Sequence, residues 1–117
     1  MKQKKLFSED EVMYYFTMIL ISLHYLHSKE IIHRNLKPEN IFIDRLPGGV
    51  DILVIGDFGV SKLDPLNIRI TNILAGLTTP AYMAPEMISE KLSTTKVDMW
   101  ALGVILYQLV FSNKLPF

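Results

Sequence analysis

The feature that most constrains this chain is a regularly spaced row of large apolar side chains that follows a helix-start signal. Ser8 and Glu11 fit the S-x-x-E pattern, in which each side chain accepts a hydrogen bond from the other residue's backbone amide. The row continues at spacings of 4, 3, 4 and 3 residues, which puts its members on one helix face: Val12, Phe16, Ile19, Leu23 and Leu26. Most residues between these positions are also apolar, so we expect a helix that is buried on more than one side.

A second apolar helix is expected near the C-terminus. Thr95 and Asp98 resemble another capping box, and residues 99–111 are apolar nearly all round, which is typical of a helix surrounded by protein. We expect this helix to end near Ser112 and Asn113. Neither apolar stretch offers the roughly 20 predominantly apolar residues that a membrane span needs, so no membrane partner is predicted.

The stretch between these helices contains two segments of different amino-acid composition. Two short runs rich in β-branched residues, 41–43 and 52–55, flank a Pro47-Gly48-Gly49 turn signal and predict a hairpin. Residues 57–93 hold glycine, proline, serine and threonine without a clear period, and we expect a long, functional irregular segment there. The order helix, hairpin, irregular segment, helix predicts an α+β fold that is mostly helical.

Composition excludes several classes of protein. Half of the residues are apolar, as in an ordinary globular domain, and the 12 basic side chains balance 12 acidic ones. This balance gives no electrostatic reason to expect a nucleic acid or an anionic membrane as partner. The absence of cysteine excludes disulfides, a thiolate nucleophile and zinc–thiolate sites, and it favours a cytoplasmic or nuclear location.

Three short motifs carry the chemistry. The run His33–Asn40 (HRNLKPEN) is followed 17 residues later by Asp57-Phe58-Gly59 and then by Ala84-Pro85-Glu86. This series resembles the signature motifs of eukaryotic protein kinases in their usual order, and its Leu-Lys-Pro-Glu-Asn wording is similar to that of serine/threonine kinases.

The resemblance covers essentially all 117 residues and implies one partial kinase domain, the large or C-terminal lobe, incomplete at both ends. It implies a long helix, a catalytic loop with its hairpin, an activation segment and a central hydrophobic helix. The family transfers the ATP γ-phosphate to serine or threonine of a protein substrate. A protein substrate or other protein partner is therefore expected.

By the same resemblance, Asn40 and Asp57 would ligate Mg²⁺, a hard cation that prefers oxygen donors. Lys37 would lie beside the transferring phosphoryl group of ATP as a point charge. The catalytic-loop aspartate of the family is here Asn35, whose neutral amide cannot take a proton at neutral pH. General-base assistance is worth about 10²–10⁴-fold in rate, so the resemblance implies a preserved nucleotide site with feeble or absent transfer.

The activation segment offers further implied roles. Arg34 would receive a phosphate on that segment, and Thr71 lies where a regulatory phosphate would fall, although an unmodified threonine is the alternative. Thr79 matches the threonine that contacts the catalytic loop in serine/threonine kinases. The run Gly76-Leu77-Thr78 suggests a small insertion in the peptide-docking loop.

Four residues are expected to be structural. His33 would pack in the core rather than act as an acid or base, and Phe58 would support the motif that it belongs to. Asp98 is either an acid favoured by a helix N-terminus or, by resemblance, a buried carboxylate that holds the catalytic-loop backbone. Glu86 would pair with an arginine that lies beyond this sequence.

The sequence contains no G-x-G-x-x-G loop, and neither a Val-Ala-Ile-Lys strand nor a helix glutamate precedes Ser8. We therefore expect the small lobe in a longer parent chain, and a marginal or aggregation-prone state for these residues alone. Three hypotheses remain open: part of an active kinase, a pseudokinase that binds nucleotide or protein partners, and a truncated gene product without a folded state.

Overall fold

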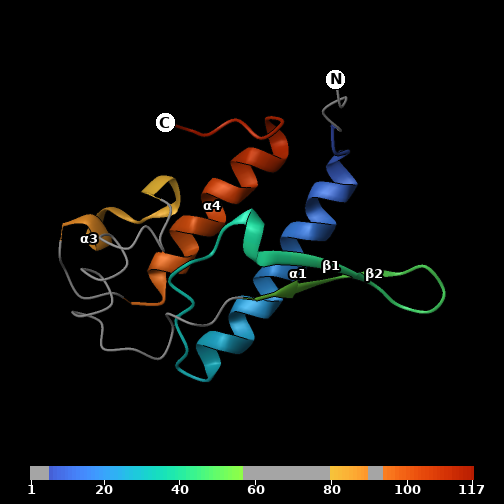
Figure 1. Ribbon diagram of the computed structural model, residues 1–117, viewed down its shortest axis with the longest axis horizontal. Coiled ribbons are helices and arrows are strands. Elements are labelled where there is room, and N and C mark those ends of the chain that lie inside the picture. The colour runs from blue at the N-terminus through green and yellow to red at the C-terminus, as the bar shows by residue number, and fades with distance from the viewer. Residues whose placement is uncertain (1–5, 57–79, 90–93) are drawn as a thin grey trace.

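The computed structural model describes residues 6–56, 80–89 and 94–117 of the chain (Figure 1). Two long helices, α1 (Glu9–Ser28) and α4 (Lys96–Val110), pack against each other, and the antiparallel hairpin β1 (Ile41–Arg45) and β2 (Asp51–Ile55) packs on α1 through β2. A short helix, α3 (Pro85–Ile88), and two single 3₁₀ turns, η1 (Pro38–Asn40) and η2 (Pro80–Tyr82), complete the described elements. Within the described residues, no helix is long and apolar enough to cross a membrane.

Helix α1 begins at the predicted capping box. The Ser8 amide donates to Glu11 Oε2 at 2.9 Å, and the Glu11 amide donates to Ser8 Oγ at 3.2 Å. The helix ends in a Schellman motif, in which the Ile31 amide donates to Leu26 O and the Glu30 amide to His27 O, both at 3.0 Å. This ending places Glu30 at φ 58°, a left-handed conformation that glycine adopts most easily.

Only one side of α1 is buried. Val12, Ile19 and Leu23 face inward, whereas Ile21 and Tyr25 on the outer side are each 62% exposed. The prediction that the helix is buried on more than one side is therefore wrong for the described part of the chain. The cause is geometric, because α4 and β2 both pack against the inward row and leave the outer apolar residues uncovered.

The predicted hairpin is confirmed. Its register pairs Ile41 with Ile55 and Arg45 with Asp51. The turn requires its two glycines, because Gly48 and Gly49 have φ of 95° and 84°. The Tyr14 hydroxyl donates to the Asp51 carbonyl at 2.5 Å, which fastens the hairpin to the first turns of α1.

Helix α4 differs from its prediction in two ways. Thr95 makes no side-chain capping bond; instead, Thr94 Oγ1 accepts from the Lys96 amide at 3.3 Å, so the predicted capping box is wrong. The helix is also not surrounded by protein among the described residues, since Met99 and Trp100 are about 40% exposed. Its end is as expected, with Phe111 as C-cap and the Asn113 amide bonded to Gln108 O at 2.8 Å.

Two apolar clusters form the core. The larger joins α1, β2 and α4 through side chains such as Leu23, Leu53 and Leu102, and it includes Leu36 from the segment between helix and hairpin. The smaller joins Met83, Met87 and Val97 near η2 and α3. These two short elements lie in a stretch that the sequence predicted to be irregular. The 33–40 loop, defined here as residues His33–Asn40, follows Ile32, which packs against the smaller cluster, and contributes Leu36 to the larger one.

Candidate functional site

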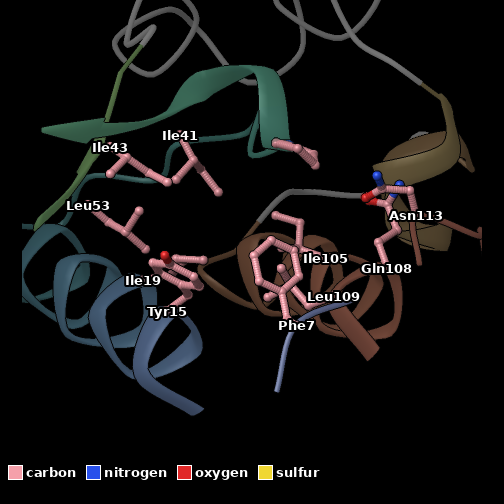
Figure 2. A pocket seen from close by; sticks show the side chains of 11 residues that line it. Phe7, Tyr15, Ile19, Ile41, Ile43, Leu53, Ile105, Gln108, Leu109 and Asn113 are labelled. Atoms are coloured by element: carbon pink, nitrogen blue, oxygen red, sulfur yellow. The ribbon is translucent and has the colours of Figure 1, made fainter. Parts of the chain in front are cut away.

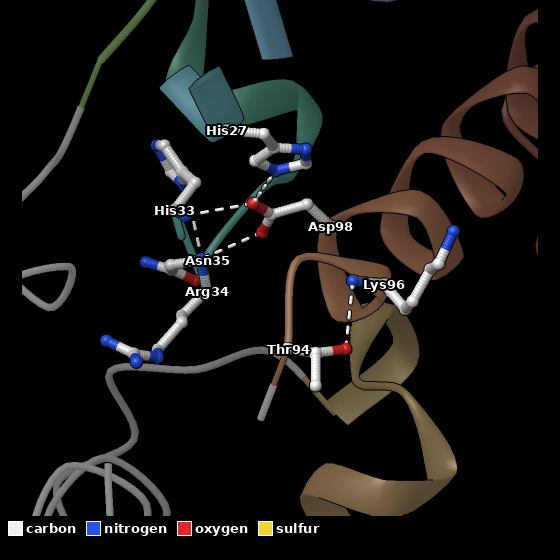
Figure 3. Close-up of polar contacts among 7 residues, drawn as sticks. All are labelled: His27, His33, Arg34, Asn35, Thr94, Lys96 and Asp98. Carbon is white, nitrogen blue, oxygen red and sulfur yellow. Dashed lines mark hydrogen bonds and ion pairs between the residues drawn. The ribbon is translucent and has the colours of Figure 1, made fainter. Parts of the chain in front are cut away.

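The centre of the site is the carboxylate of Asp98, which α4 places in its first turn. Asp98 is 1% exposed and accepts three hydrogen bonds from residues that lie 64 to 71 positions earlier in the chain (Figure 3). Its Oδ2 accepts from His27 Nε2 at 2.8 Å and from the His33 amide at 2.9 Å, and its Oδ1 accepts from the Arg34 amide at 2.9 Å. Because the Asp98 carboxylate accepts from these long-range donors rather than from a backbone amide at the start of α4, no capping box forms.

His33 is completely buried and links the loop to the end of β2. Its Nε2 lies 2.6 Å from the Gly56 carbonyl, and its Nδ1 lies 3.2 Å from the Asn35 amide. A carbonyl can only accept and a backbone amide can only donate, so Nε2 carries the hydrogen and Nδ1 is the acceptor. Both ring nitrogens are thus engaged in holding backbone.

Arg34 has an uncommon backbone conformation. Its φ is 67°, in the left-handed region that costs a non-glycine residue roughly 1–2 kcal/mol. The bond from its amide to Asp98 helps to hold that conformation. Burial lowers the pKa of the Arg34 guanidinium below its usual value, and the negative charge of Asp98 partly offsets this effect. The side chain nevertheless remains a cation.

Asn35 is fixed on both sides of its α-carbon. Its amide donates to His33 Nδ1, and its carbonyl accepts from Asn40 Nδ2 at 2.7 Å. The Asn35 residue is 5% exposed. Its side chain therefore projects from a rigid point, and its neutral amide cannot serve as a general base.

Asn40 has the chemistry of a hard-cation ligand. Because its Nδ2 donates to the Asn35 carbonyl, its Oδ1 remains the atom that could bind Mg²⁺. Among the described residues, no three His, Cys, Asp or Glu side chains form a metal-ligand group. A magnesium ion bound with nucleotide needs only one or two protein ligands besides the phosphates, so this finding is compatible with such a site.

The other predicted residues fall into two groups. Lys37 is half-buried, in extended backbone at the start of η1, and Glu86 is half-buried in the first turn of α3. The remaining ones lie outside the described residues: Asp57, Phe58, Thr71 and Thr79. The loop thus brings Arg34, Asn35, Lys37 and Asn40 together, while the second predicted magnesium ligand is not placed.

An apolar cavity of about 220 Å³ lies between α1, the hairpin and α4 (Figure 2). Ile41, Ile43, Ile105 and Leu109 contribute to its wall, with the polar side chains of Gln108 and Asn113 at one end. Among the described residues predicted for the site, none lines this cavity. The candidate chemistry therefore belongs to the polar 33–40 loop rather than to the cavity.

Sequence reasoning missed two contributors to the site and one contact outside it. His27 holds Asp98 and the Gly56 carbonyl holds His33, while away from the loop the Tyr82 hydroxyl donates to Gln108 Oε1 at 2.8 Å and ties η2 to α4. Each contact joins residues at least 23 positions apart, and no local spacing rule predicts such a pair. A histidine in the last turn of α1 gives only a weak local signal, namely its favourable position at a helix C-terminus.

Comparisons with known proteins were made over the whole chain. The family model described as "Protein kinase domain" matches residues 1–117. The chain is 40% identical over 126 residues to the probable serine/threonine-protein kinase nek1 of Dictyostelium discoideum, covering 97% of this chain and 25% of that protein. It is 40% identical over 111 residues to the serine/threonine-protein kinase sgk-1 of Caenorhabditis elegans, covering 95% and 23%.

A third relative is the 3-phosphoinositide-dependent protein kinase B of Dictyostelium discoideum, which is 41% identical over 119 residues. That match covers 100% of this chain and 13% of the relative. The chain thus spans about a quarter or less of the length of these curated relatives.

Proposed function

Because the chain belongs to the protein kinase domain family, whose model matches residues 1–117, we propose that it supplies the catalytic-loop part of a serine/threonine-kinase-type site. The proposed site binds ATP with Mg²⁺ and faces a protein substrate, and it transfers the γ-phosphate slowly or not at all. Since the relatives are several times longer, this function belongs to the whole protein of which the described loop is a part.

The observation that carries the proposal is the position of Asn35 in a rigid loop. The neighbouring backbone is held by Asp98, by His33 and by Asn40, so the Asn35 side chain starts from a fixed position. An asparagine has nearly the shape of an aspartate but cannot accept the proton of a substrate hydroxyl. The geometry of the loop therefore supports nucleotide binding, whereas Asn35 lowers the expected rate of phosphoryl transfer.

The nucleotide-binding half of the proposal rests on three residues. Asn40 Oδ1 and the carboxylate of Asp57 would hold Mg²⁺, which neutralises phosphate charge when bound. Lys37 would place a positive charge beside the γ-phosphate, where a compact ammonium acts without the two-pronged geometry of an arginine. The hydrogen bond from Asn40 Nδ2 to the Asn35 carbonyl supports this arrangement, because it fixes the orientation of the Asn40 oxygen.

The test is transfer of the γ-phosphate to a serine/threonine peptide by the full-length protein and by its Asn35→Asp variant. We expect the variant to be faster by about 10²–10⁴-fold, the usual worth of a general base. Asn113→Asp is the matched control, since it makes the same chemical change at an exposed residue beyond the far end of α4. Equal and measurable rates for wild type and Asn35→Asp, or an equal gain for Asn113→Asp and Asn35→Asp, would contradict the role assigned to Asn35.

Binding is measured separately by thermal unfolding with ATP and Mg²⁺. A ligand at 100 times its Kd stabilises the folded state by about 2.7 kcal/mol, and we expect such a shift for both wild type and Asn35→Asp. A shift without transfer in either protein would favour a second function, a pseudokinase that binds nucleotide and does no chemistry. No shift in either protein would refute the nucleotide site.

A further inference from the structure

We propose that His27 is a positioning residue for phosphoryl transfer, because through Asp98 it fixes the backbone that carries residue 35. The inference rests on the proposed function, since a positioning role has meaning only for a loop that takes part in transfer. It goes beyond that function by assigning a role to a histidine of α1, which lies outside the 33–40 loop and outside the residues that the sequence predicted for the site.

The contact between His27 and Asp98 joins the end of α1 to the start of α4 (Figure 3). The His27 Nε2 atom lies 2.8 Å from Asp98 Oδ2. A carboxylate oxygen can only accept, so Nε2 carries the hydrogen and donates it. The same Oδ2 accepts from the His33 amide at 2.9 Å, and Oδ1 accepts from the Arg34 amide at 2.9 Å. His27 therefore shares one carboxylate oxygen with the backbone of the loop.

The orientation of the Asp98 carboxylate decides whether both loop amides are held. Its two oxygens accept from consecutive amides, so a rotation of the carboxylate group disturbs both bonds at once. The terminal torsion of an aspartate is broad and does not fix this orientation by itself. The bond from His27 restrains it, because the imidazole comes from the last turn of a helix whose end is closed by its own backbone hydrogen bonds.

The strained conformation of Arg34 makes the loop sensitive to this restraint. With φ at 67°, Arg34 is in the left-handed region, and the bond from its amide to Asp98 helps to hold it there. If the carboxylate turns, the strained residue relaxes, and Asn35 moves with it because it follows directly in the chain. A displacement of about 1 Å at a reacting group can lower a rate by about 10²-fold. His27 thus acts on residue 35 through two intermediate residues.

The predicted magnesium ligand Asn40 has an anchor of its own. Its carbonyl accepts from the Gly56 amide at 2.8 Å, a bond that involves neither Asp98 nor His27. Asn40 also leads directly into β1, which pairs with β2 along its whole length. Loss of the His27 bond should therefore lower kcat for transfer much more than it changes KM for ATP.

The experiment compares His27→Gln with His27→Asn in the full-length protein that also carries Asn35→Asp. The glutamine amide nitrogen is as many bonds from the α-carbon as the histidine Nε2 and can donate to Asp98, whereas the asparagine amide nitrogen is one bond closer and falls short. We expect kcat to fall at least about tenfold in His27→Asn and less than about threefold in His27→Gln, with KM for ATP within about threefold in both. His24→Asn is the matched control, because His24 is exposed on the same helix, and it should keep both constants.

Hydrogen exchange of backbone amides gives a readout that does not depend on transfer. The amide of Ile105, in the interior of α4, reports opening of the whole fold, whereas the amides of His33 and Arg34 report the loop. In His27→Asn the increase in exchange rate at His33 and Arg34 should exceed that at Ile105 by at least about tenfold. In His27→Gln the three amides should keep the wild-type pattern.

An equal increase at all three amides, or equal kcat in His27→Asn and His27→Gln, would show that His27 acts only on overall stability and would overturn the proposal. Should His27→Asn not fold, His27→Leu takes its place with the same expectations, since leucine also lacks a donor and is a stronger helix former. If the Asn35→Asp protein transfers no phosphate while the exchange rates change as expected, the proposed function fails and the fixation of the loop by His27 stands. Transfer with unchanged exchange in His27→Asn would leave the proposed function and remove this inference.

Discussion

Asp98 is the residue on which the loop geometry depends most. Its buried carboxylate accepts from His27 and from two backbone amides, and Asp98→Asn would point an amide group at donors that need an acceptor. A buried donor left without an acceptor costs roughly 1–3 kcal/mol, a large part of a domain's stability. Because Asp98 accepts from three donors, we expect a loss of about 3 kcal/mol in the free energy of unfolding.

Chemical denaturation of the full-length protein measures this effect. Asp44→Asn is the matched control, because Asp44 lies exposed on β1 and its change should stay within about 0.5 kcal/mol. A loss for Asp98→Asn no larger than that of the control would show that the three bonds contribute little to stability.

Tyr82 gives a prediction about pH. Partial burial raises the pKa of its phenol above the usual value, and the charge of Glu39 raises it further. A group whose pKa is higher in the folded state holds its proton more tightly there, so its contribution is fully present below the unfolded pKa of about 10 and is lost as pH rises above it.

We therefore expect the free energy of unfolding of wild type to fall more steeply above about pH 10 than that of Tyr82→Phe. At neutral pH the variant should lose only about 1 kcal/mol, the worth of one hydrogen bond. Denaturation curves of both proteins between pH 7 and 11 make the comparison. Parallel curves across that range would show that the phenol does not titrate differently in the folded state.

At the scale of elements, a single substitution at the end of α1 is expected to stabilise the fold. Glu30 occupies the left-handed position of a Schellman motif, where a side chain is strained and glycine is not. Glu30→Gly should raise the free energy of unfolding by about 0.5–1 kcal/mol, after the entropy that glycine adds to the unfolded chain is subtracted. Thermal and chemical denaturation both report this gain.

The neighbouring residue provides the control for that change. Lys29 is the C-cap, with φ −97°, so Lys29→Gly relieves no left-handed strain and should destabilise the protein or leave it unchanged. If both glycine variants change stability in the same direction and by the same amount, the gain does not come from the backbone conformation of Glu30.

Elements set by neighbouring residues were predictable from the sequence. The Ser8–Glu11 cap, the 4-3-4-3 apolar row and the glycine turn all act within a few residues, and all three appear in the structure. The predicted cap at Thr95 does not form, because Asp98 accepts hydrogen bonds from His33 and Arg34 instead. These residues are far apart in the sequence, so local patterns do not predict the contacts. The loop residues of the site were named through family resemblance, whereas their fixation by His27 and Gly56 needed the fold.

At the scale of the whole molecule, the outer face of α1 is the feature with a measurable consequence. Met13, Ile21 and Tyr25 are more than half exposed, and clustered exposed apolar side chains promote association. Ile21→Lys should reduce concentration-dependent light scattering and dye binding by the 117-residue chain, while changing its free energy of unfolding by less than about 0.5 kcal/mol.

Thr17→Lys is the matched control for this prediction. Thr17 is exposed on α1 one helical turn before Ile21, so its replacement adds the same charge without removing apolar surface. Equal scattering of Ile21→Lys and Thr17→Lys would mean that added charge, not the lost apolar side chain, governs association. Scattering unchanged in both would place the associating surface elsewhere.

The bond from the Arg34 amide to Asp98 also bears on how this chain can change in length. It joins residues 64 positions apart and closes a loop that contains the hairpin and the stretch after it. The entropy cost of closing a flexible loop grows with the logarithm of its length, and each doubling adds only about 0.6 kcal/mol. Lengthening the chain between the two anchors therefore adds little to the entropy cost of closure, so the anchored loop does not depend on a fixed length of that stretch.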